Sequence, residues 1–498
     1  MSFNTLLPVF ALMTSLLASV IIFSLPEQRH GLRTTVNLLA AGLKLVLVCI
    51  MVWGVFHGEE YRADFTMLPG VTFVLKADAL SVMFAGLSAV LWLLTTVYAV
   101  GYLEDSPNRS RFFGFFSLCV ASTMGIALAG NLFTFFLFYE MLTLSTYPLV
   151  VHRGSPAALR AGRNYIIYTL TGGAVLLLAI AWLQGLVGSL EFQAGGHFAG
   201  LDPAIHGQLS IVFILLIAAL GVKAAIFPLH GWLPQAMVAP APVSALLHAV
   251  AVVKAGAFGI VRVVYDIYGI EFSAGLGLLE PLAWLAAFTI IYGSMRALWQ
   301  TDLKRRLAFS TISQVSYIIL GITLLGPVGT AGGLVHLLHQ GIMKITLFFC
   351  AGNYAETLGV HRVDELDGAG RRMPATSVAF TIGAFGMIGA PPLAGFITKW
   401  TLGEGALAAG MAWAIPVLLL SSLLNAAYFL PVVHRLWFRA AAADWPAERT
   451  WGRLETHGWL FWPPVITAVM TVGVGVLASL PFSPLSWAEL IAEREFLP

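Results

Sequence analysis

Charged residues are scarce in this sequence, at 10% of its 498 positions, whereas a soluble domain carries about 25%. Hydrophobic residues make up 58%, and the mean hydropathy is +0.85. This composition excludes an ordinary soluble protein and predicts an all-α polytopic membrane protein. The net charge of +2 gives no indication of a nucleic-acid partner, and we expect none.

Cysteine is also scarce. Cys49, Cys119 and Cys350 fall in separate apolar stretches, which excludes a cysteine-ligated iron–sulfur cluster or zinc ribbon within this chain. The sequence lacks a G-x-x-x-x-G-K-[ST] loop, a dinucleotide fingerprint and an H-E-x-x-H motif. His336 and His339 alone are too few for structural zinc. We therefore expect no cofactor, no metal site and no catalytic site in this chain.

Long apolar runs dominate what is present. A run of about 20 residues spans the hydrocarbon core of a bilayer as a helix. The first run has no charged segment before it and no small-residue cleavage site after it, so we interpret it as a retained helix. Fourteen runs are long enough, and they cover residues 4–25, 34–56, 79–101, 111–129, 131–151, 162–187, 208–237, 243–265, 276–299, 304–325, 329–356, 375–410, 414–437 and 459–481.

Lysine and arginine alternate between the two sets of loops that join these runs. Loops that lead from odd-numbered to even-numbered runs hold 17 basic residues, and the opposite loops hold only Arg62 and Lys76. Because basic loops stay in the cytoplasm, both termini are predicted to lie outside. The expected location is a bacterial inner membrane, with the lipid bilayer as surroundings.

Two long runs contain helix-breaking prolines, Pro228 and Pro234 in the seventh run and Pro391 and Pro392 in the twelfth. Proline removes a backbone donor and kinks a helix, and a membrane tolerates this only where protein or water satisfies the freed groups. Broken helices beside buried cations are typical of ion sites in transporters.

The two breaks share a short pattern. Residues 228–232 read Pro-Leu-His-Gly-Trp, and residues 392–396 read Pro-Leu-Ala-Gly-Phe. The two runs are five apart and therefore cross in opposite directions, as inverted repeats do. A kink pattern that recurs by chance is the alternative, and the lysines differ in position, since Lys223 precedes its break whereas Lys399 follows.

Ionisable side chains lie within the apolar runs, although a lysine at the centre of a membrane helix costs about 2.5–3.5 kcal/mol. Glu140, in NLFTFFLFYEMLTLSTYPLV, is the only carboxylate clearly at membrane depth. Five lysines cannot all pair with one carboxylate, so most must be hydrated or neutral part of the time, which is the physics of a proton relay. A static Glu140–Lys223 ion pair and a Lys44 that snorkels to the interface stay open as alternatives. The set is Lys44, Glu140, Lys223, Lys254, Lys344 and Lys399.

Histidines accompany two of these lysines. In the segment HLLHQGIMK, His336 and Lys344 are eight residues apart, so they share one helix face at about 12 Å, with His339 between them. His248 precedes Lys254 by six residues, or about 9 Å along one helix axis. The alternative for each histidine is a buried ring that only satisfies a backbone carbonyl.

Several long motifs, in order, resemble the antiporter-like subunits shared by respiratory complex I, membrane-bound hydrogenases and Mrp-type Na⁺/H⁺ antiporters. The resemblance covers roughly residues 75–440. It implies fourteen helices, two inverted five-helix repeats (helices 4–8 and 9–13) and discontinuous helices 7 and 12. The motifs are FYEMLTLSTYPLV, KAAIFPLHGWLPQAMVAPAPVSALLHAVAVVKAG, TDLKRRLAFSTISQVSY and GMIGAPPLAGFITKW.

The resemblance also implies a division of the chain and a role for its ionisable residues. Helices 1–3 would occupy residues 1–110, the two repeats 111–265 and 266–440, and helix 14 the remainder to 498. Glu140 and Lys223 match the family's glutamate–lysine pair. The central lysine, the histidine and lysine of helix 11, and the ionisable residue of helix 12 are matched by Lys254, His336, Lys344 and Lys399, respectively.

Two positions refine this expectation. Gln340 stands where the family often has histidine, and His339 is a possible substitute for that link. Lys399 resembles Mrp D-type subunits, because the complex I middle subunit usually has glutamate there. We therefore expect a proton-conducting subunit of a Mrp-type antiporter complex that works with other membrane subunits and protons, with Na⁺ passage left open.

Two other functions stay open at this point. One is a proton-channel coupling subunit of a redox complex, a hydrogenase or an inorganic-carbon uptake complex, with a cytosolic enzyme subunit as partner. The other is a scaffold with an inactive channel.

Overall fold

The computed structural model describes residues 3–68, 71–103, 106–198, 200–441 and 445–496. Within them, twelve helices are long and apolar enough to cross a membrane, which confirms a mostly helical polytopic membrane protein. Each of the fourteen predicted runs contains helix; the two outside the twelve are α13, which has three basic residues in its first turn, and the split pair α16–α17. The number of crossings, fourteen, remains a prediction.

The helix bounds follow the chain in order. The first half contains α1 Phe3–Ser24, α2 His30–Phe56, α3 Ala79–Tyr102, α4 Arg109–Ala127, α5 Leu132–Val150, α6 Pro156–Val187, α7 His206–Ala224, α8 Trp232–Gln235, α9 Ala241–Ala249, α10 Val252–Arg262 and α11 Ile270–Gly275. The second half contains α12 Leu279–Leu298, α13 Leu303–Thr323, α14 Pro327–Leu358, α15 Ala369–Arg372, α16 Pro374–Ile388, α17 Ala394–Ala408, α18 Ala414–Phe438, α19 Gly458–Val476 and α20 Pro484–Phe496. Short 3-10 or π turns cover Pro203–Ile205, Ala236–Val238, Val263–Tyr268 and Val363–Glu365.

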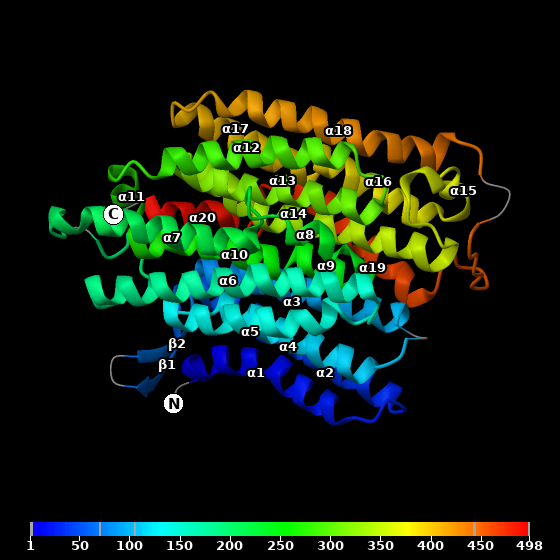
Figure 1. The fold of residues 1–498 in the computed structure, drawn as a ribbon, viewed down its shortest axis with the longest axis horizontal. Helices are drawn as coiled ribbons and strands as arrows, with labels where there is room; N and C mark the ends of the chain where they lie inside the picture. Colours follow the sequence, from blue (N-terminus) through cyan, green and yellow to red (C-terminus); the bar gives the residue numbers. More distant parts are fainter. Residues whose placement is uncertain (1–2, 69–70, 104–105, 199, 442–444, 497–498) are drawn as a thin grey trace.

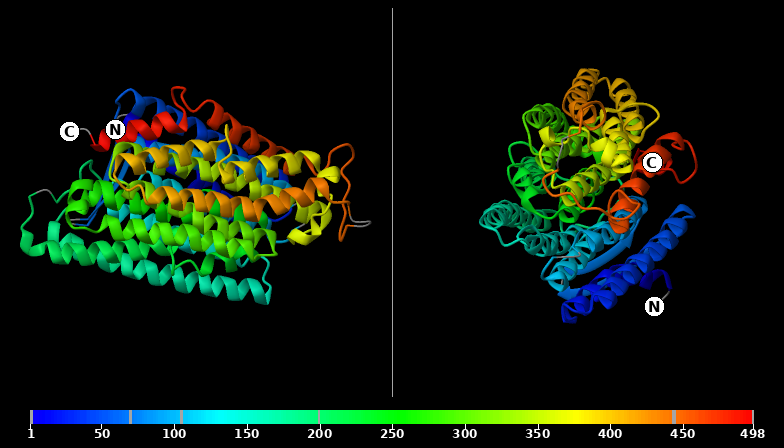
Figure 2. Two further views of the ribbon diagram at one scale, coloured as in Figure 1. Left: turned by 90° about the horizontal axis from the view of Figure 1, so that it is seen from above. Right: turned by 90° about the vertical axis from the view of Figure 1, so that its right-hand side faces the viewer.

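The long helices lie side by side, roughly along the horizontal axis of Figure 1, and both chain ends lie at the same end of the bundle (Figures 1 and 2). In the end-on view of Figure 2, α1 and α2 lie at one side of the cross-section and α17 and α18 at the opposite side. The span from Ala241 to Tyr268 is buried along its whole length, and α14 is almost as buried. These central helices carry most of the predicted site residues.

The first predicted break is present. Helix α7 ends at Ala224, and Ala225 adopts a left-handed conformation with φ of 57°. The Trp232 indole donates to the carbonyl of Val222 (2.8 Å), so the aromatic residue after the proline satisfies a carbonyl at the helix end. Pro228 lies within the break and Pro234 lies in the short helix α8.

The second predicted break separates α16 from α17. Helix α16 ends at Ile388, Gly389 follows in a left-handed conformation with φ of 96°, and α17 resumes at Ala394. Pro391 and Pro392 lie in the intervening segment. The discontinuous seventh and twelfth runs predicted from the sequence are therefore confirmed.

A third break was not predicted. Run 243–265 was expected as one helix, but it consists of α9, α10 and the π turn η3 (Val263–Tyr268), with an interruption at Val250 and Ala251. The Ala249 carbonyl faces α14, where a Cβ on Gly341 would lie 2.8 Å from its oxygen. The interruption therefore lies against the helix that carries His336, His339 and Lys344.

A β-hairpin joins α2 to α3, although no strands were predicted. Strands β1 (Tyr61–Leu68) and β2 (Val71–Ala77) pair antiparallel, with Arg62 opposite Lys76. Arg62 also forms ion pairs with Asp64 (2.9 Å) and Glu191 (3.0 Å). Hydrogen bonding to Arg62 lowers the pKa of Glu191, so this carboxylate stays charged near neutral pH. The basic residues of this loop thus have structural partners.

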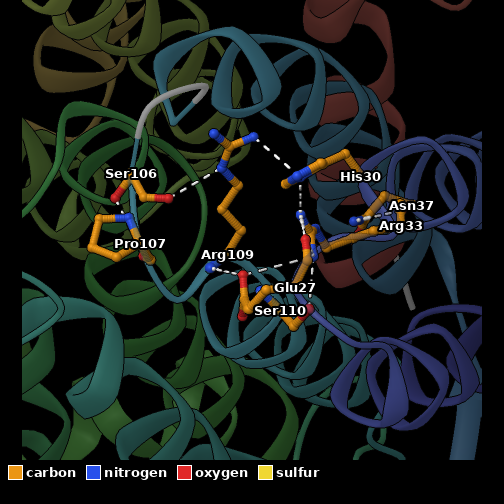
Figure 3. Close-up of polar contacts among 8 residues, drawn as sticks. All are labelled: Glu27, His30, Arg33, Asn37, Ser106, Pro107, Arg109 and Ser110. Carbon is orange, nitrogen blue, oxygen red and sulfur yellow. Dashed lines mark hydrogen bonds and ion pairs between the residues drawn. The ribbon is translucent and has the colours of Figure 1, made fainter.

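Helix α4 begins under a cap supplied by another loop (Figure 3). The Glu27 carboxylate accepts the backbone N–H groups of Arg109 (2.8 Å) and Ser110 (3.0 Å). The Arg33 guanidinium donates to the Ser110 hydroxyl (2.7 Å) and lies 2.9 Å from His30 Nδ1. Because first-turn N–H groups have no partner within the helix, this network fixes the α1–α2 loop against α4.

At the opposite end of the bundle, buried Arg262 joins several acidic groups. Its guanidinium donates to the carboxylates of Asp78 and Asp266 and to the Ser81 hydroxyl, at 2.7–2.9 Å. Burial alone would raise the pKa of Asp78, but the positive charge and hydrogen bonds around it, chiefly those of Arg262, together have the larger effect and lower this pKa to about 2. Helix α20 adds a further acidic residue, Glu495, whose carboxyl group interacts electrostatically with Asp266.

Glu495 makes the stability of this end pH-dependent. Burial, together with Asp266, raises the pKa of Glu495 from 4.5 to about 8. The folded protein therefore retains a proton that the unfolded chain releases, and the stabilisation present below pH 4.5 is lost as pH rises through about 8.

The variant Glu495→Gln is expected to unfold at a higher temperature than the unmodified protein at pH 8–9 and at nearly the same temperature at pH 4.5. The measurement is thermal unfolding of the detergent-solubilised protein across this pH range. The exposed neighbour Glu493 provides the control, Glu493→Gln. A difference that does not change with pH would contradict this account.

Candidate functional site

Glu140 and Lys223 come from α5 and α7. Lys223 is fully buried, donates to the backbone carbonyl of Tyr139, and places its ammonium 3.3 Å from the centre of the Tyr139 ring. The buried Oε1 of Glu140 has no hydrogen-bond partner, and a Cβ on Gly173 of α6 would lie 2.4 Å from it. The predicted Glu140–Lys223 ion pair is thus not formed, because the ammonium contacts Tyr139 instead.

Lys254 and His248 lie near the unpredicted break. Both are fully buried, and neither the Lys254 ammonium nor either nitrogen of His248 has a hydrogen-bond partner in the protein. The His248 ring stacks on Phe348 of α14, with ring centres 4.6 Å apart. Because the two residues lie on different helices, the spacing of about 9 Å along one axis predicted from the sequence does not apply.

Helix α14 is continuous and places His336, His339 and Lys344 in the interior, as the pattern indicated. His339 Nδ1 lies 3.0 Å from the Thr398 hydroxyl, whereas both nitrogens of His336 lack partners. The buried amide of Gln340, at the position where histidine was expected, also has no partner.

The Lys344 ammonium donates to the Ser310 hydroxyl (2.6 Å) and to the Leu307 carbonyl (3.3 Å), both on α13. The Lys399 ammonium reaches back from α17 to the carbonyls of Met387 (3.2 Å) and Ile388 (2.7 Å). Lys399 therefore places its ammonium at the end of α16. Lys223 lies in the last turn of α7, but its ammonium contacts Tyr139 of α5 instead.

Lys44 does not snorkel to the interface. It is fully buried between the first three helices, where it donates to Ser15 (2.6 Å) and lies 4.3 Å from the centre of the Trp92 ring. The snorkelling alternative is thus wrong for Lys44. It is far along the chain from the other lysines, and its contacts join α1, α2 and α3.

Three neutral residues, Ser310, Asn425 and Tyr428, were missed by the sequence reasoning. The Tyr428 hydroxyl contacts Ser310 Oγ (2.8 Å) and donates to Asn425 Oδ1, and the Asn425 amide donates to the Met387 carbonyl (2.9 Å). These contacts connect Lys344 to the carbonyl that accepts from Lys399. Asn425 and Tyr428 are three residues apart on α18 and therefore lie on one helix face. This spacing is the sequence signal that could have identified these two residues.

The interior is polar beyond the lysines. A buried polar atom without a partner costs about 1–3 kcal/mol, so water is expected beside these groups. Within the described residues, no group of three or more His, Cys, Asp or Glu side chains could hold a metal ion. Unpartnered polar atoms occur on Lys254, His248, His336, Gln340, Gln314, Tyr317 and Ser421.

Residues 129–425 match the family described as NADH:quinone oxidoreductase/Mrp antiporter, TM, and residues 69–113 match the N-terminal region of complex I chain 5. The N-type subunit of the NADH-quinone oxidoreductase of Desulforudis audaxviator is 35% identical over 84% of each chain. The D-type subunit of the Na⁺/H⁺ antiporter of Bacillus subtilis is 29% identical over 76% of each chain. One protein in the structure of the Mrp complex from Dietzia sp. DQ12-45-1b superposes with a TM-score of 0.87 at 26% identity, covering 100% of this chain and 98% of that one. The chain therefore belongs to the NADH:quinone oxidoreductase/Mrp antiporter family of membrane proteins.

Proposed function

We propose that this chain is the proton-conducting subunit of a Mrp-type cation/proton antiporter complex. The observation that carries the proposal is the series of buried lysines and histidines that extends through the central helices, from Lys223 at the end of α7 to Lys399 at the end of α16. Charges in a membrane interior are costly and are retained where ions or protons move.

The proposed route begins at Glu140 and Lys223 and continues through Lys254 and His248. From there it passes along His336, His339 and Lys344 to Lys399 and the outside. The stacking of His248 on Phe348 and the contact of Ala249 with Gly341 support a transfer between α9–α10 and α14. The fully buried groups hold the proton within the bundle, and Lys399, which is only partly buried, lies at the end of the route.

The Glu140–Lys223 separation supplies a switch. When the Lys223 ammonium leaves Tyr139 and approaches Glu140, the carboxylate neutralises its positive charge. The change in the local field then alters the proton affinity of Lys254, since nearby like charges disfavour the charged form. A neighbouring subunit that moves this pair would drive, or be driven by, proton flow.

The membrane setting belongs to the same proposal. Fourteen spans, two inverted repeats at 111–265 and 266–440, and both termini outside a bacterial inner membrane account for the distribution of basic loops. The breaks after α7 and after α16, each with a lysine close to it in the sequence, favour the inverted repeat over a chance pattern. Residues 1–110 and 441–498 would then flank the repeats and contact other membrane subunits.

A second function is favoured by one observation, the 35% identity to a NADH-quinone oxidoreductase subunit. In that case the same proton route would serve a redox complex, a hydrogenase or an inorganic-carbon uptake complex. A cytosolic enzyme subunit would then be the partner.

The two functions are separated by purifying the complex from its native membrane together with its partner chains. The complex is reconstituted into liposomes that contain a pH-sensitive dye, and an Na⁺ gradient is imposed. An internal pH change driven by Na⁺ supports the antiporter. A pH change that requires a redox substrate or another enzymatic reaction, and never follows Na⁺, would contradict the antiporter and favour the second function.

A further inference from the structure

We propose that the Tyr428 hydroxyl is the gate through which a proton passes from Lys344 to Lys399; this inference rests on the proposed proton route. Tyr428 is on α18, and its hydroxyl contacts Ser310 on α13 and Asn425 on α18. All three side chains are at least 99% buried. They connect two lysines that lie on different helices and make no direct contact with each other.

The contacts form one continuous series. The Lys344 ammonium donates to Ser310 Oγ at 2.6 Å, and the Tyr428 hydroxyl lies 2.8 Å from the same oxygen. The Tyr428 hydroxyl also contacts Asn425 Oδ1, and the Asn425 amide donates to the Met387 carbonyl at 2.9 Å. Lys399 donates to that carbonyl at 3.2 Å. Lys399 therefore shares an acceptor with the residue that holds the Tyr428 hydroxyl.

The Tyr428 hydroxyl has one hydrogen and two oxygen partners, so it can donate to only one of them at a time. Asn425 Oδ1 can only accept, whereas the Ser310 hydroxyl can either donate or accept. When Tyr428 donates to Asn425, Ser310 is free to donate to Tyr428 while it accepts from Lys344. When Tyr428 instead donates to Ser310, Ser310 accepts from Tyr428 and must turn its own hydrogen away from it.

Asn425 closes the gate because a carboxamide does not take up and release protons near neutral pH. A proton that moves along the hydroxyls stops while Tyr428 donates to Asn425. The gate opens when the Tyr428 hydroxyl turns from Asn425 towards Lys399, directly or through one water molecule. Asn425 thus sets the resting orientation of the hydroxyl and Tyr428 carries the proton.

The proton count balances over one transfer. Charged Lys344 gives a proton to Ser310 Oγ as Ser310 passes its own proton to Tyr428. Tyr428 in turn passes its proton to the neutral amine of Lys399. Lys344 ends neutral and Lys399 charged, and both hydroxyls keep one hydrogen but point the other way. Rotation of the two hydroxyls resets the gate.

The first test is Tyr428→Phe, measured in the native complex reconstituted in liposomes. Losing a positioned proton carrier costs roughly 10²–10⁴-fold in proton-transfer steps, so the maximal rate of proton flux is expected to fall at least about 10-fold. The apparent KM for the driving ion or substrate should not change, because the hydroxyl does not bind it. Tyr354→Phe provides the matched control, since Tyr354 is also buried and bonds Ser377 (2.9 Å) outside this series.

The second test has the opposite sign. Asn425→Leu removes the group that holds the hydroxyl closed, so it is expected to increase the passive proton leak of the liposomes under an imposed membrane potential. A purely structural role of these residues would lower transport in both variants. If Tyr428→Phe fails to assemble, Ser310→Ala interrupts the same series and is expected to lower the flux likewise.

Full proton flux in the assembled Tyr428→Phe or Ser310→Ala complex would refute the proposed gate. An Asn425→Leu variant whose passive proton leak is unchanged would refute it as well. The comparison with Glu140→Gln separates this result from failure of the proposed function. If Glu140→Gln stops the proton flux and Tyr428→Phe does not, the proposed proton route is supported and the proposed gate is wrong. If Glu140→Gln also retains the flux, the proton route itself is wrong.

Discussion

Replacing Glu140 by glutamine is expected to lower proton flux at least about 100-fold while the complex still assembles. Glutamine has nearly the same size as glutamate but cannot bind and release a proton, and loss of an acid–base group costs roughly 10²–10⁴-fold. The site tolerates the amide sterically, because Glu140 lies against Gly173 and its buried oxygen has no partner to lose. The flux is measured in liposomes with a pH dye, and assembly by the recovery of all chains in the purified complex.

The exposed carboxylate Glu404 on α17, which accepts from the Trp400 indole (2.8 Å), provides the control. Glu404→Gln is expected to keep the flux of the unmodified complex. Wild-type flux in the assembled Glu140→Gln complex would refute the role of Glu140 at the start of the route.

Gly256→Ala is expected to lower the stability of the protein strongly, although it adds only one methyl group. A Cβ on Gly256 would lie 2.3 Å from the Ala224 nitrogen, 2.7 Å from the Leu220 oxygen and 2.8 Å from the Lys223 carbonyl carbon. All three are backbone atoms of α7, which no side-chain rotation can move away. Overpacking typically costs about 1–3 kcal/mol and more where backbone must shift. Since α7 must move near Lys223, we expect lower thermal stability and lower transport together.

Gly403→Ala provides the matched control, because a Cβ at this helical glycine meets no atom within 4 Å. Alanine is favoured over glycine inside a helix by about 1 kcal/mol, so this variant should be as stable as the unmodified protein or more stable. Thermal unfolding in detergent tests both variants. Equal unfolding temperatures for Gly256→Ala and Gly403→Ala would contradict the close approach of α10 to α7.

The parts of the fold that were predicted correctly are those with a strong signal in the local sequence. Apolar runs and prolines predicted the long helices and the breaks beside Pro228 and Pro391. The break at Val250 and Ala251 was missed because neither residue disfavours a helix locally, and only packing against Gly341 reveals it. The hairpin that begins at Tyr61 was not predicted, because its strands of 8 and 7 residues are much shorter than a membrane-spanning run.

The charged residues of the candidate site could be predicted from the sequence, whereas its neutral residues could not. A lysine or glutamate within an apolar run is conspicuous, so the ionisable residues were found and the structure places them in the interior. Neutral Ser310 and Tyr428 were not found, because hydroxyls occur throughout these helices and their partners come from distant parts of the chain. The position of the Lys223 ammonium could not be predicted either, since it depends on a side-chain orientation that favours Tyr139 over Glu140.

The backbone breaks give the two central lysines opposite electrostatic surroundings. Aligned peptide dipoles leave about half a positive charge at a helix N-terminus and half a negative charge at a C-terminus. Lys223 lies in the last turn of α7, whereas Lys254 is the third residue of α10. The main chain thus favours a cation at the first position and opposes one at the second, by about 0.3–1 kcal/mol each and up to about 2 kcal/mol where solvent is partly excluded. An uneven energy profile for the travelling charge is therefore built into the fold before any carboxylate acts on it.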